Sequence, residues 1–319
     1  MRVPFTLDLH ISNFNYPDTD PSQVFDKIVA IAQTAETAGF GSVSMMDHLH
    51  QIPVIGAASN WMFEGSTMLA AIAARTTTLK LGLLVGSVTY RNPALAAKIT
   101  TTIDIISGGR AWHGLGAGWF EEEQRAYGYE VVPLKDRFEK LEEALQISRS
   151  MFTNGQSSFS GKHFKVEGAF NNPQPIRGDI PIVVGGSGER KTLRLVARYA
   201  DGCNLFGGPE RVKHLLGVLE QHCADVGRDP AEITKTGLGQ VIIGKTHEEA
   251  EQKVSWMRSN GVSDEALALF ITGDSDTVGE RVQELRDVGL EGWGFSMPDA
   301  HDLEAVELAG RTLAPIFTP

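Results

Sequence analysis

The chain has 319 residues, with 29 Lys and Arg against 40 Asp and Glu, so its formal net charge at pH 7 is −11 with histidine neutral. The basic residues are not segregated, and an acidic chain of this kind binds polyanions poorly, which excludes duplex nucleic acid and anionic membranes as expected partners. A hydrophobic content of 42% and a charged content of 22% are near the globular average and exclude a long disordered chain.

The cysteines and the N-terminal residues indicate where the protein resides. Cys203 and Cys223 are too few and too far apart for a CxxC pair or a disulfide framework. The first residues lack the apolar core of a signal peptide, and no stretch approaches the 18 or so apolar residues of a membrane span. We therefore expect a cytoplasmic protein.

Short apolar or β-branched runs alternate along the chain with stretches of helical period, a pattern typical of a parallel sheet with crossover helices. Strands are expected at 3–9, 42–46, 80–85, 110–115, 180–184, 201–206, 233–243 and 291–296. The helices are expected at 21–38, 67–75, 93–107, 133–152, 189–199, 209–226, 248–259, 277–288 and 303–314. Asp20-Pro21 and Asn92-Pro93 are interpreted as helix starts, and Gly39 and Gly108-Gly109 as helix ends.

The number of strand and helix units decides between one domain and two. Length alone suggests about two domains, but α/β barrels of about 250 residues form one unit. Eight units in one chain predict an α/β fold, a closed (β/α)₈ TIM barrel forming a single domain over 1–319. The segment at about 153–180 breaks the alternation with Asn154-Gly155 and Pro173-Gln174-Pro175, and we interpret it as a small insertion after the fourth helix.

In such barrels the reactive groups follow the C-terminal ends of the strands. The second strand ends in Asp47-His48, a carboxylate beside a side chain that titrates near neutrality. A loop cap at Asp47 and a packed His48 are the alternative. His10 ends the first strand and points either into the barrel mouth or into the core.

Glycine makes up 34 of the 319 residues, and two groups of glycines follow strands. Gly114, Gly116 and Gly118 alternate, which suggests bare backbone against something flat or bulky, or relief of crowding at the rim. Trp119 stands where the dinucleotide fingerprint has its third glycine, so that motif is excluded.

The second group is Gly185-Gly186-Ser187-Gly188, followed by a predicted helix with Arg190, Lys191 and Arg194. Backbone N–H groups, a helix N-terminus and cations predict an anion site, typically for phosphate, with a plain turn and cap as the alternative. Glu121-Glu122-Glu123 is interpreted as a solvated helix start. No metal-ligand spacing is evident, so no metal is expected.

Several segments together resemble the bacterial luciferase-like monooxygenase family. They are 41–48 (GSVSMMDH), 89–98 (TYRNPALAAK), 114–121 (GLGAGWFE) and the loop at 185–188 (GGSG). With the loop included, the resemblance covers nearly the whole chain. Within the family, the chain is most similar to the branch that uses the deazaflavin coenzyme F(420).

The resemblance implies a flat isoalloxazine or deazaflavin at the C-terminal mouth of the barrel, with its phosphate on the loop at 185–188. Family members also carry a non-proline cis peptide at the end of the third strand, which aligns with Leu84-Val85. The cofactor-binding residues implied are Asp47, Leu84, Val85, Gly86, Gly116, Ala117, Gly118, Tyr127, Gly185, Gly186, Ser187, Gly188 and Arg190.

The resemblance also implies that His48 is catalytic, orienting the substrate or exchanging a proton while a hydride passes to or from the deazaflavin. Two positions depart from the sugar-phosphate dehydrogenases of this branch: their glutamate falls at Trp119 and their tryptophan near Ile52. We therefore expect a small organic substrate other than a sugar phosphate. Trp119, His10 and Trp61 are the expected substrate-binding residues, and Trp61, Met62, Phe63 and Trp119 would make an apolar mouth.

Two alternatives to a coenzyme F(420)-dependent oxidoreductase stay open. One is an FMN-dependent monooxygenase of the same fold that uses reduced flavin and oxygen. The other is a non-catalytic flavin-binding protein. The resemblance further implies a homodimer through the helices near strands two and three.

Overall fold

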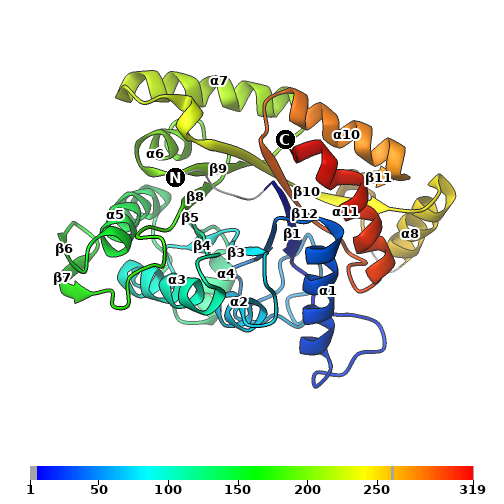
Figure 1. The fold of residues 1–319 in the computed structure, drawn as a ribbon, viewed down its shortest axis with the longest axis horizontal. Helices are drawn as coiled ribbons and strands as arrows, with labels where there is room; N and C mark the ends of the chain where they lie inside the picture. Colours follow the sequence, from blue (N-terminus) through cyan, green and yellow to red (C-terminus); the bar gives the residue numbers. More distant parts are fainter. Residues whose placement is uncertain (1–5, 260–261, 319) are drawn as a thin grey trace.

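A computed structural model describes residues 6–259 and 262–318, and its centre is a parallel sheet. The strands in spatial order are β3 (Lys80–Leu83), β2 (Ser42–Met45), β1 (Leu7–Ile11), β12 (Gly292–Ser296), β10 (Thr234–Ile243), β9 (Gly202–Leu205), β8 (Ile182–Gly185), β5 (His113–Gly116) and β4 (Gly86–Ser87). A further parallel bridge joins Leu81 of β3 to Ala111, just before β5. The sheet therefore curls into a nearly closed barrel with helices around it (Figure 1).

The predicted (β/α)₈ barrel is confirmed, because each of the eight expected strand positions carries a strand of the barrel. The ends differ by a few residues: strand four begins at His113 rather than at 110, and positions 3–5 lie outside the described residues. Two short strands of this sheet were not predicted. These are β4, which pairs with β5, and β11 (Phe270–Gly273), which pairs with the end of β10.

The helices cover the outside of the barrel, and α11 lies beside α1 (Figure 1). They are α1 (Val24–Ala38), α2 (Gly65–Ala73), α3 (Pro93–Ser107), α4 (Glu121–Ala126), α5 (Leu134–Thr153), α6 (Thr192–Tyr199), α7 (Pro209–Val226), α8 (His247–Ser259), α9 (Asp264–Leu267), α10 (Ser275–Asp287) and α11 (Leu303–Phe317). Among the described residues, none of these helices is both long and apolar enough to span a membrane.

Local capping explains which predicted helix ends are right. The Asn92 side chain accepts a hydrogen bond from Ala94 N at 2.9 Å, and α3 ends at Gly108 with φ +70°, as predicted. The predicted start at Asp20-Pro21 is wrong, because Gln23 N bonds Asp20 O in a turn and α1 begins only at Val24. The predicted start of α6 at 189 is also wrong, because the chain forms a turn until Thr192.

The predicted insertion contains an antiparallel hairpin of β6 (Gln156–Ser160) and β7 (Lys165–Phe170), which forms a separate two-stranded sheet. It lies beside α5 at the periphery of the barrel (Figure 1). The Asn172-Pro173 peptide that follows is cis.

Alternation along β1 divides the apolar core from a polar barrel interior. Leu7, Leu9 and Ile11 are buried in the apolar cluster that includes residues of α1 and α11. Because strand side chains alternate between faces, Asp8 and His10 point the other way, into the barrel. In the β1–β2 register Asp8 is paired with Ser42 and His10 with Ser44, so polar side chains from two strands meet inside.

Candidate active site

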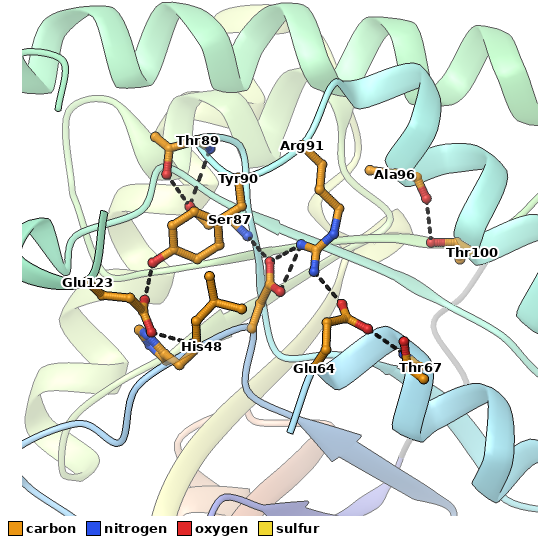
Figure 2. Close-up of polar contacts among 12 residues, drawn as sticks. His48, Glu64, Thr67, Ser87, Thr89, Tyr90, Arg91, Ala96, Thr100 and Glu123 are labelled. Atoms are coloured by element: carbon orange, nitrogen blue, oxygen red, sulfur yellow. Dashed lines mark hydrogen bonds and ion pairs between the residues drawn. The ribbon is translucent and has the colours of Figure 1, made fainter. Parts of the chain in front are cut away.

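The predicted catalytic residue His48 lies at the barrel mouth, three residues beyond β2, and its partner is Glu123 of α4. Nδ1 of His48 lies 3.0 Å from Oε2 of Glu123 (Figure 2). The side chain of His48 keeps 14% of its surface exposed, whereas that of Glu123 is 0% exposed. The pair thus joins a buried carboxylate to an imidazole that reaches solvent.

Glu123 accepts hydrogen bonds on both oxygens. Oε2 takes the Tyr90 hydroxyl besides His48, and Oε1 takes the backbone N–H of Leu49 and, at 2.6 Å, of His50. Burial acts to raise the pKa of Glu123, but the hydrogen bonds from His48, Tyr90, His50 and Leu49 outweigh it and hold the pKa below its ordinary value.

An ionised carboxylate only accepts hydrogen bonds, so the Nδ1 of His48 must carry the proton it donates to Glu123. This assigns neutral His48 to the tautomer whose Nε2 is an open acceptor. Burial and the bond to Glu123 raise the pKa of Tyr90, so its hydroxyl stays a donor. The site can therefore take up a proton at one defined atom, Nε2 of His48.

The interpretation of Glu121-Glu122-Glu123 as a solvated helix start is wrong for its third residue. Glu121 and Glu122 are at least partly exposed, but α4 turns Glu123 inward beneath the loop that carries His48. The sequence did not indicate the role of Glu123, because three consecutive acidic residues are typical of a solvent-exposed helix start. Tyr90 lies within the 89–98 segment that carried the family resemblance, but nothing in the sequence assigned it a role.

Asp47 lies beside His48 but is buried in an ion cluster. Arg91 Nη1 lies 2.8 and 2.7 Å from its two oxygens, and Ser87 N donates to Oδ2 at 2.8 Å. Arg91 Nη2 continues the cluster to Glu64 (Figure 2). Burial raises the pKa of Asp47, and the charge of Arg91 opposes this rise.

The cavity behind this cluster measures about 30 Å³ and is partly lined by Asp47, Ser87 and Arg91. That volume suits a water molecule and is far below the few hundred Å³ of ligand pockets. With its oxygens occupied, Asp47 anchors the β2 end to the strand that follows β3. These contacts are those of a residue that anchors a loop, which is the alternative role that the sequence left open for Asp47.

Aromatic side chains surround His48. The Trp119 ring is 57% exposed, stacks on Phe120 at 5.0 Å and meets His48 edge-on at 5.5 Å. Tyr127 is exposed, contacts the His50 ring at 5.3 Å and donates to Leu49 O at 3.4 Å. Trp119 and Tyr127 therefore flank the His48 loop.

The other two expected substrate residues lie deeper. Trp61, together with Met62 and Phe63, packs against the apolar cluster around α1 and α2. His10 is 5% exposed, and its Nδ1 bonds Ser44 Oγ at 2.8 Å.

The alternating glycines are required by the protein's own packing. A Cβ at Gly114 would lie 1.9 Å from Leu83 O, and one at Gly116 would lie 2.7 Å from the Val85 side chain. A Cβ at Gly185 would also meet Val85, at 2.8 Å. The Leu84-Val85 peptide preceding these contacts is cis, at the position that the resemblance implied. Crowding at the rim, the alternative in the sequence, therefore accounts for Gly114 and Gly116.

Three further rim positions also lie close against other parts of the protein. Gly118 has φ +75°, and a Cβ there would lie 2.6 Å from Ser87 Oγ, while Gly86 approaches Gly114 O. Ala117 packs against the apolar cluster around α5 and α6. These positions bring the ends of β4 and β5 together at the mouth.

The loop at 185–188 fits an anion. Gly186 has φ +124° and its N–H is bonded to Asn204 O at 3.0 Å, while the Ser187 hydroxyl accepts from Phe206 N. Within the described ranges, the amides of Ser187 and Gly188 have no hydrogen-bond partner in the protein. The exposed side chains of Arg190, Lys191 and Arg194 follow, none of them ion-paired to a described residue, and Lys191 lies 5.2 Å over the Phe138 ring. This donor set suits a phosphate group.

One cluster of potential metal ligands lies away from the mouth. Asp136, Glu139 and His163 bring their ligand atoms within 4.8 Å of one another. Lys162 Nζ already lies 3.3 Å from Asp136 and 2.6 Å from Glu139, so an ammonium group occupies the place of a cation. The arrangement is a surface ion-pair network.

Comparison with known sequences identifies the family of the chain. The model of the luciferase-like monooxygenase family matches residues 6–266. An F(420)-dependent glucose-6-phosphate dehydrogenase of Segniliparus rotundus is 27% identical, over 91% of this chain and 93% of the relative. The pyrimidine monooxygenase RutA of Variovorax paradoxus is 31% identical, over 82% of this chain and 70% of the relative.

Solved structures agree on the fold. The coenzyme F(420)-dependent tetrahydromethanopterin reductase of Methanopyrus kandleri superposes with a TM-score of 0.77 at 22% identity, over the full length of both chains. An F(420)-dependent secondary alcohol dehydrogenase reaches a TM-score of 0.81 at 17% identity, over 99% of this chain and 100% of that one. The chain thus belongs to the luciferase-like monooxygenase family and is an enzyme of the oxidoreductase class.

Proposed function

We propose that the protein is a coenzyme F(420)-dependent oxidoreductase that acts on a small organic substrate other than a sugar phosphate. The observation that carries the proposal is the His48–Glu123 pair at the barrel mouth, with Nδ1 bonded to a buried carboxylate at 3.0 Å. The reduction of a carbonyl, or the reverse oxidation, requires one proton besides the hydride, and the pair provides a defined atom for it.

The loop at 185–188, called the anion loop below, would hold the phosphate of the cofactor. The amides of Ser187 and Gly188, which no described residue bonds, would bind its oxygens, and Arg190, Lys191 and Arg194 would attract an anionic tail. When bound, the deazaflavin supplies hydride transfer. The chain's own part is to hold the ring at the mouth and to place His48 beside the substrate.

In this mechanism the Nε2 atom of His48 accepts the proton of a substrate hydroxyl as the alcohol is oxidised, and returns it in the reverse direction. The resulting imidazolium would be stabilised by the carboxylate of Glu123. Tyr90 and the amides of Leu49 and His50 keep Glu123 in place, so the imidazole cannot turn away.

The side chain of Trp119 supports the proposed class of substrate. Its large exposed ring, edge-on to His48, offers an apolar wall where sugar-phosphate dehydrogenases of the branch have a glutamate. A phosphorylated sugar would meet an apolar surface there, whereas an aliphatic or aromatic alcohol or ketone would bury apolar area on it.

A second candidate is an FMN-dependent monooxygenase, which the RutA relative at 31% identity favours. The anion loop fits the phosphate of FMN as well. In that case reduced flavin would react with oxygen at the same mouth, and His48 would bind the substrate.

The discriminating experiment titrates the purified protein with coenzyme F(420) and with FMN, and follows binding by fluorescence. Turnover is then followed by the visible absorbance of F(420) with 2-propanol, acetone and glucose 6-phosphate, and by oxygen uptake with reduced FMN. We expect F(420) to bind more tightly, and an alcohol or ketone to change its absorbance in the wild type but not in His48→Ala. Oxygen uptake with FMN would establish the second candidate, and binding without any turnover would indicate a non-catalytic protein.

A further inference from the structure

The barrel interior holds a second acid–histidine arrangement that the mechanism above does not use. Asp8 and His10 of β1 point inward, beside Ser42 and Ser44 of β2. Asp8 is 0% exposed, and His10, one residue before the end of β1, is 5% exposed. The two side chains therefore run from the barrel interior to the floor of its mouth.

A single hydroxyl connects them. Nδ1 of His10 lies 2.8 Å from Ser44 Oγ, and Ser44 Oγ lies 2.5 Å from Asp8 Oδ2. Oδ1 of Asp8 is buried without a hydrogen-bond partner in the described part of the chain. Likewise, no described residue bonds Nε2 of His10, which leaves that atom for a ligand at the mouth.

Few charged side chains of described residues surround Asp8, Ser44 and His10. β2 presents Ser42 and Ser44 to Asp8, and β12 presents Gly294, where a Cβ would lie 3.1 Å from Oδ2. No described cation is ion-paired to Asp8. The titratable group facing His10, besides Asp8 through Ser44, is His48.

Burial is the largest cause of the pKa shifts of Asp8 and His10, the two ends of this hydrogen-bonded chain. It raises the pKa of Asp8 from 3.8 to about 6, against the hydrogen bonds from Ser44 and Ser42. Burial, with a smaller contribution from His48, lowers the pKa of His10 from 6.5 to about 3. Near neutral pH, Asp8 can thus gain or lose a proton, whereas His10 stays neutral.

We propose that Asp8, Ser44 and His10 form a proton relay that stores one proton inside the barrel and exchanges it with the substrate at Nε2 of His10. This inference rests on the proposed oxidoreductase function for its substrate, since a hydroxyl or carbonyl at the mouth is the group that gives or takes the proton.

The relay works by reversing its hydrogen bonds. With Asp8 ionised, Ser44 donates to Asp8, and Nδ1–H of His10 donates to Ser44, so Nε2 is an acceptor. When Nε2 takes a substrate proton, the Nδ1 proton moves to Ser44 and the Ser44 proton moves to Asp8. The product state has protonated Asp8 donating to Ser44, Ser44 donating to Nδ1, and Nε2–H pointing at the mouth.

One proton enters at Nε2, and one is gained by Oδ2 of Asp8. His10 is neutral before and after, with its tautomer exchanged, which is why its low basicity does not prevent the transfer. Serine suits the middle position because its hydroxyl donates and accepts at once. Turnover moves a single proton, so Nε2 of His48, backed by Glu123, and Nε2 of His10, backed by Asp8, are two alternative sites for that same proton at the mouth.

The test is nitrogen NMR of histidine side chains in ¹⁵N-histidine-labelled protein without cofactor, with His10 assigned through the His10→Gln variant. We expect His10 to stay neutral from pH 5 to 8 and to change from Nε2–H to Nδ1–H as the pH rises through about 6. In Asp8→Asn and in Ser44→Ala this exchange should disappear. Ser12→Ala is the matched control, because Ser12 is a buried serine that bonds Ser296 Oγ at 3.0 Å outside the relay.

The relay is refuted if His10 keeps one tautomer across this range in the wild type, becomes cationic, or titrates equally in Ser44→Ala. Because this measurement needs neither cofactor nor substrate, it is independent of the proposed function. A failure to bind coenzyme F(420) would overturn the proposed function alone. Once a substrate is found, Asp8→Asn should lower kcat about 10-fold or more without weakening F(420) binding, and should remove the ionisation near pH 6 from the kcat profile.

Discussion

His48 and Glu123 are 75 residues apart in the sequence, yet Nδ1 of one lies 3.0 Å from Oε2 of the other. The contact exists because β2 and β5 both release their chain at the same rim of the barrel, and α4 turns the third of three glutamates toward the His48 loop. The carboxylate thereby determines which nitrogen of His48 is available for chemistry.

Replacing Glu123 by Gln should lower kcat about 100-fold or more, because an amide cannot hold the Nδ1–H tautomer or stabilise an imidazolium as a carboxylate does. The dissociation constant of the cofactor should stay unchanged, which separates a role in turnover from a loss of the fold. Glu122→Gln, a change at an exposed neighbour on α4, is the control and should leave kcat unchanged. Equal effects of the two variants would contradict the assignment.

Removing the positive charges of Arg190 and Lys191 with the double substitution to Gln should weaken cofactor binding about 10-fold or more, and more at low than at high salt. The measurement is a fluorescence titration at two ionic strengths. The control is Arg281→Gln with Arg311→Gln, which removes the same charge from exposed ion pairs on α10 and α11. Unchanged affinity in the first variant would mean that the anion pocket lies elsewhere.

Substituting Gly114 by Ala should destabilise the protein by about 1–3 kcal/mol or more, because the added Cβ would overlap Leu83 O. Gly155→Ala is the control, since a Cβ there meets nothing within 4 Å. Chemical denaturation gives both free energies of unfolding. A Gly114→Ala protein of wild-type stability that had lost cofactor affinity would restore the ligand explanation for this glycine.

The buried Asp8 should make the stability of the protein depend on pH. Its pKa in the folded state, about 6, lies above the ordinary 3.8, so its contribution is fully present below about 3.8 and is lost as the pH rises through 6. This rise in the pKa of Asp8 corresponds to roughly 3 kcal/mol of folding stability. The free energy of unfolding of Asp8→Asn relative to wild type should therefore rise by up to roughly 3 kcal/mol between pH 4 and pH 8, whereas exposed Asp225→Asn should show no such trend.

The expected homodimer can be tested on α3, where Leu95 and Ile106 are exposed apolar residues three turns apart on one face. Changing both to Glu should convert a dimer into a monomer in sedimentation velocity, because two charges would be buried in the interface. Leu134→Glu, at an exposed apolar position on α5, should leave the assembly unchanged. A wild-type monomer would contradict the expectation directly.

The sequence by itself determined the eight barrel strands, the ends of α3 and the position of His48 after a strand. These follow from short-range causes: hydrophobic periodicity, side-chain caps and glycine at positive φ act within a few residues. The family resemblance also located the cis peptide at Leu84-Val85.

Only the tertiary structure decided which polar residues meet. Glu123 was predicted to be solvated and is buried, Asp47 is held by Arg91 at a separation of 44 residues, and Asp8 reaches His10 through a serine of the next strand. Burial and hydrogen bonding of a carboxylate depend on neighbours supplied by distant segments, which a local pattern of residues does not encode. The same packing showed that the glycines of β5 make room for Leu83, Trp112 and Val85.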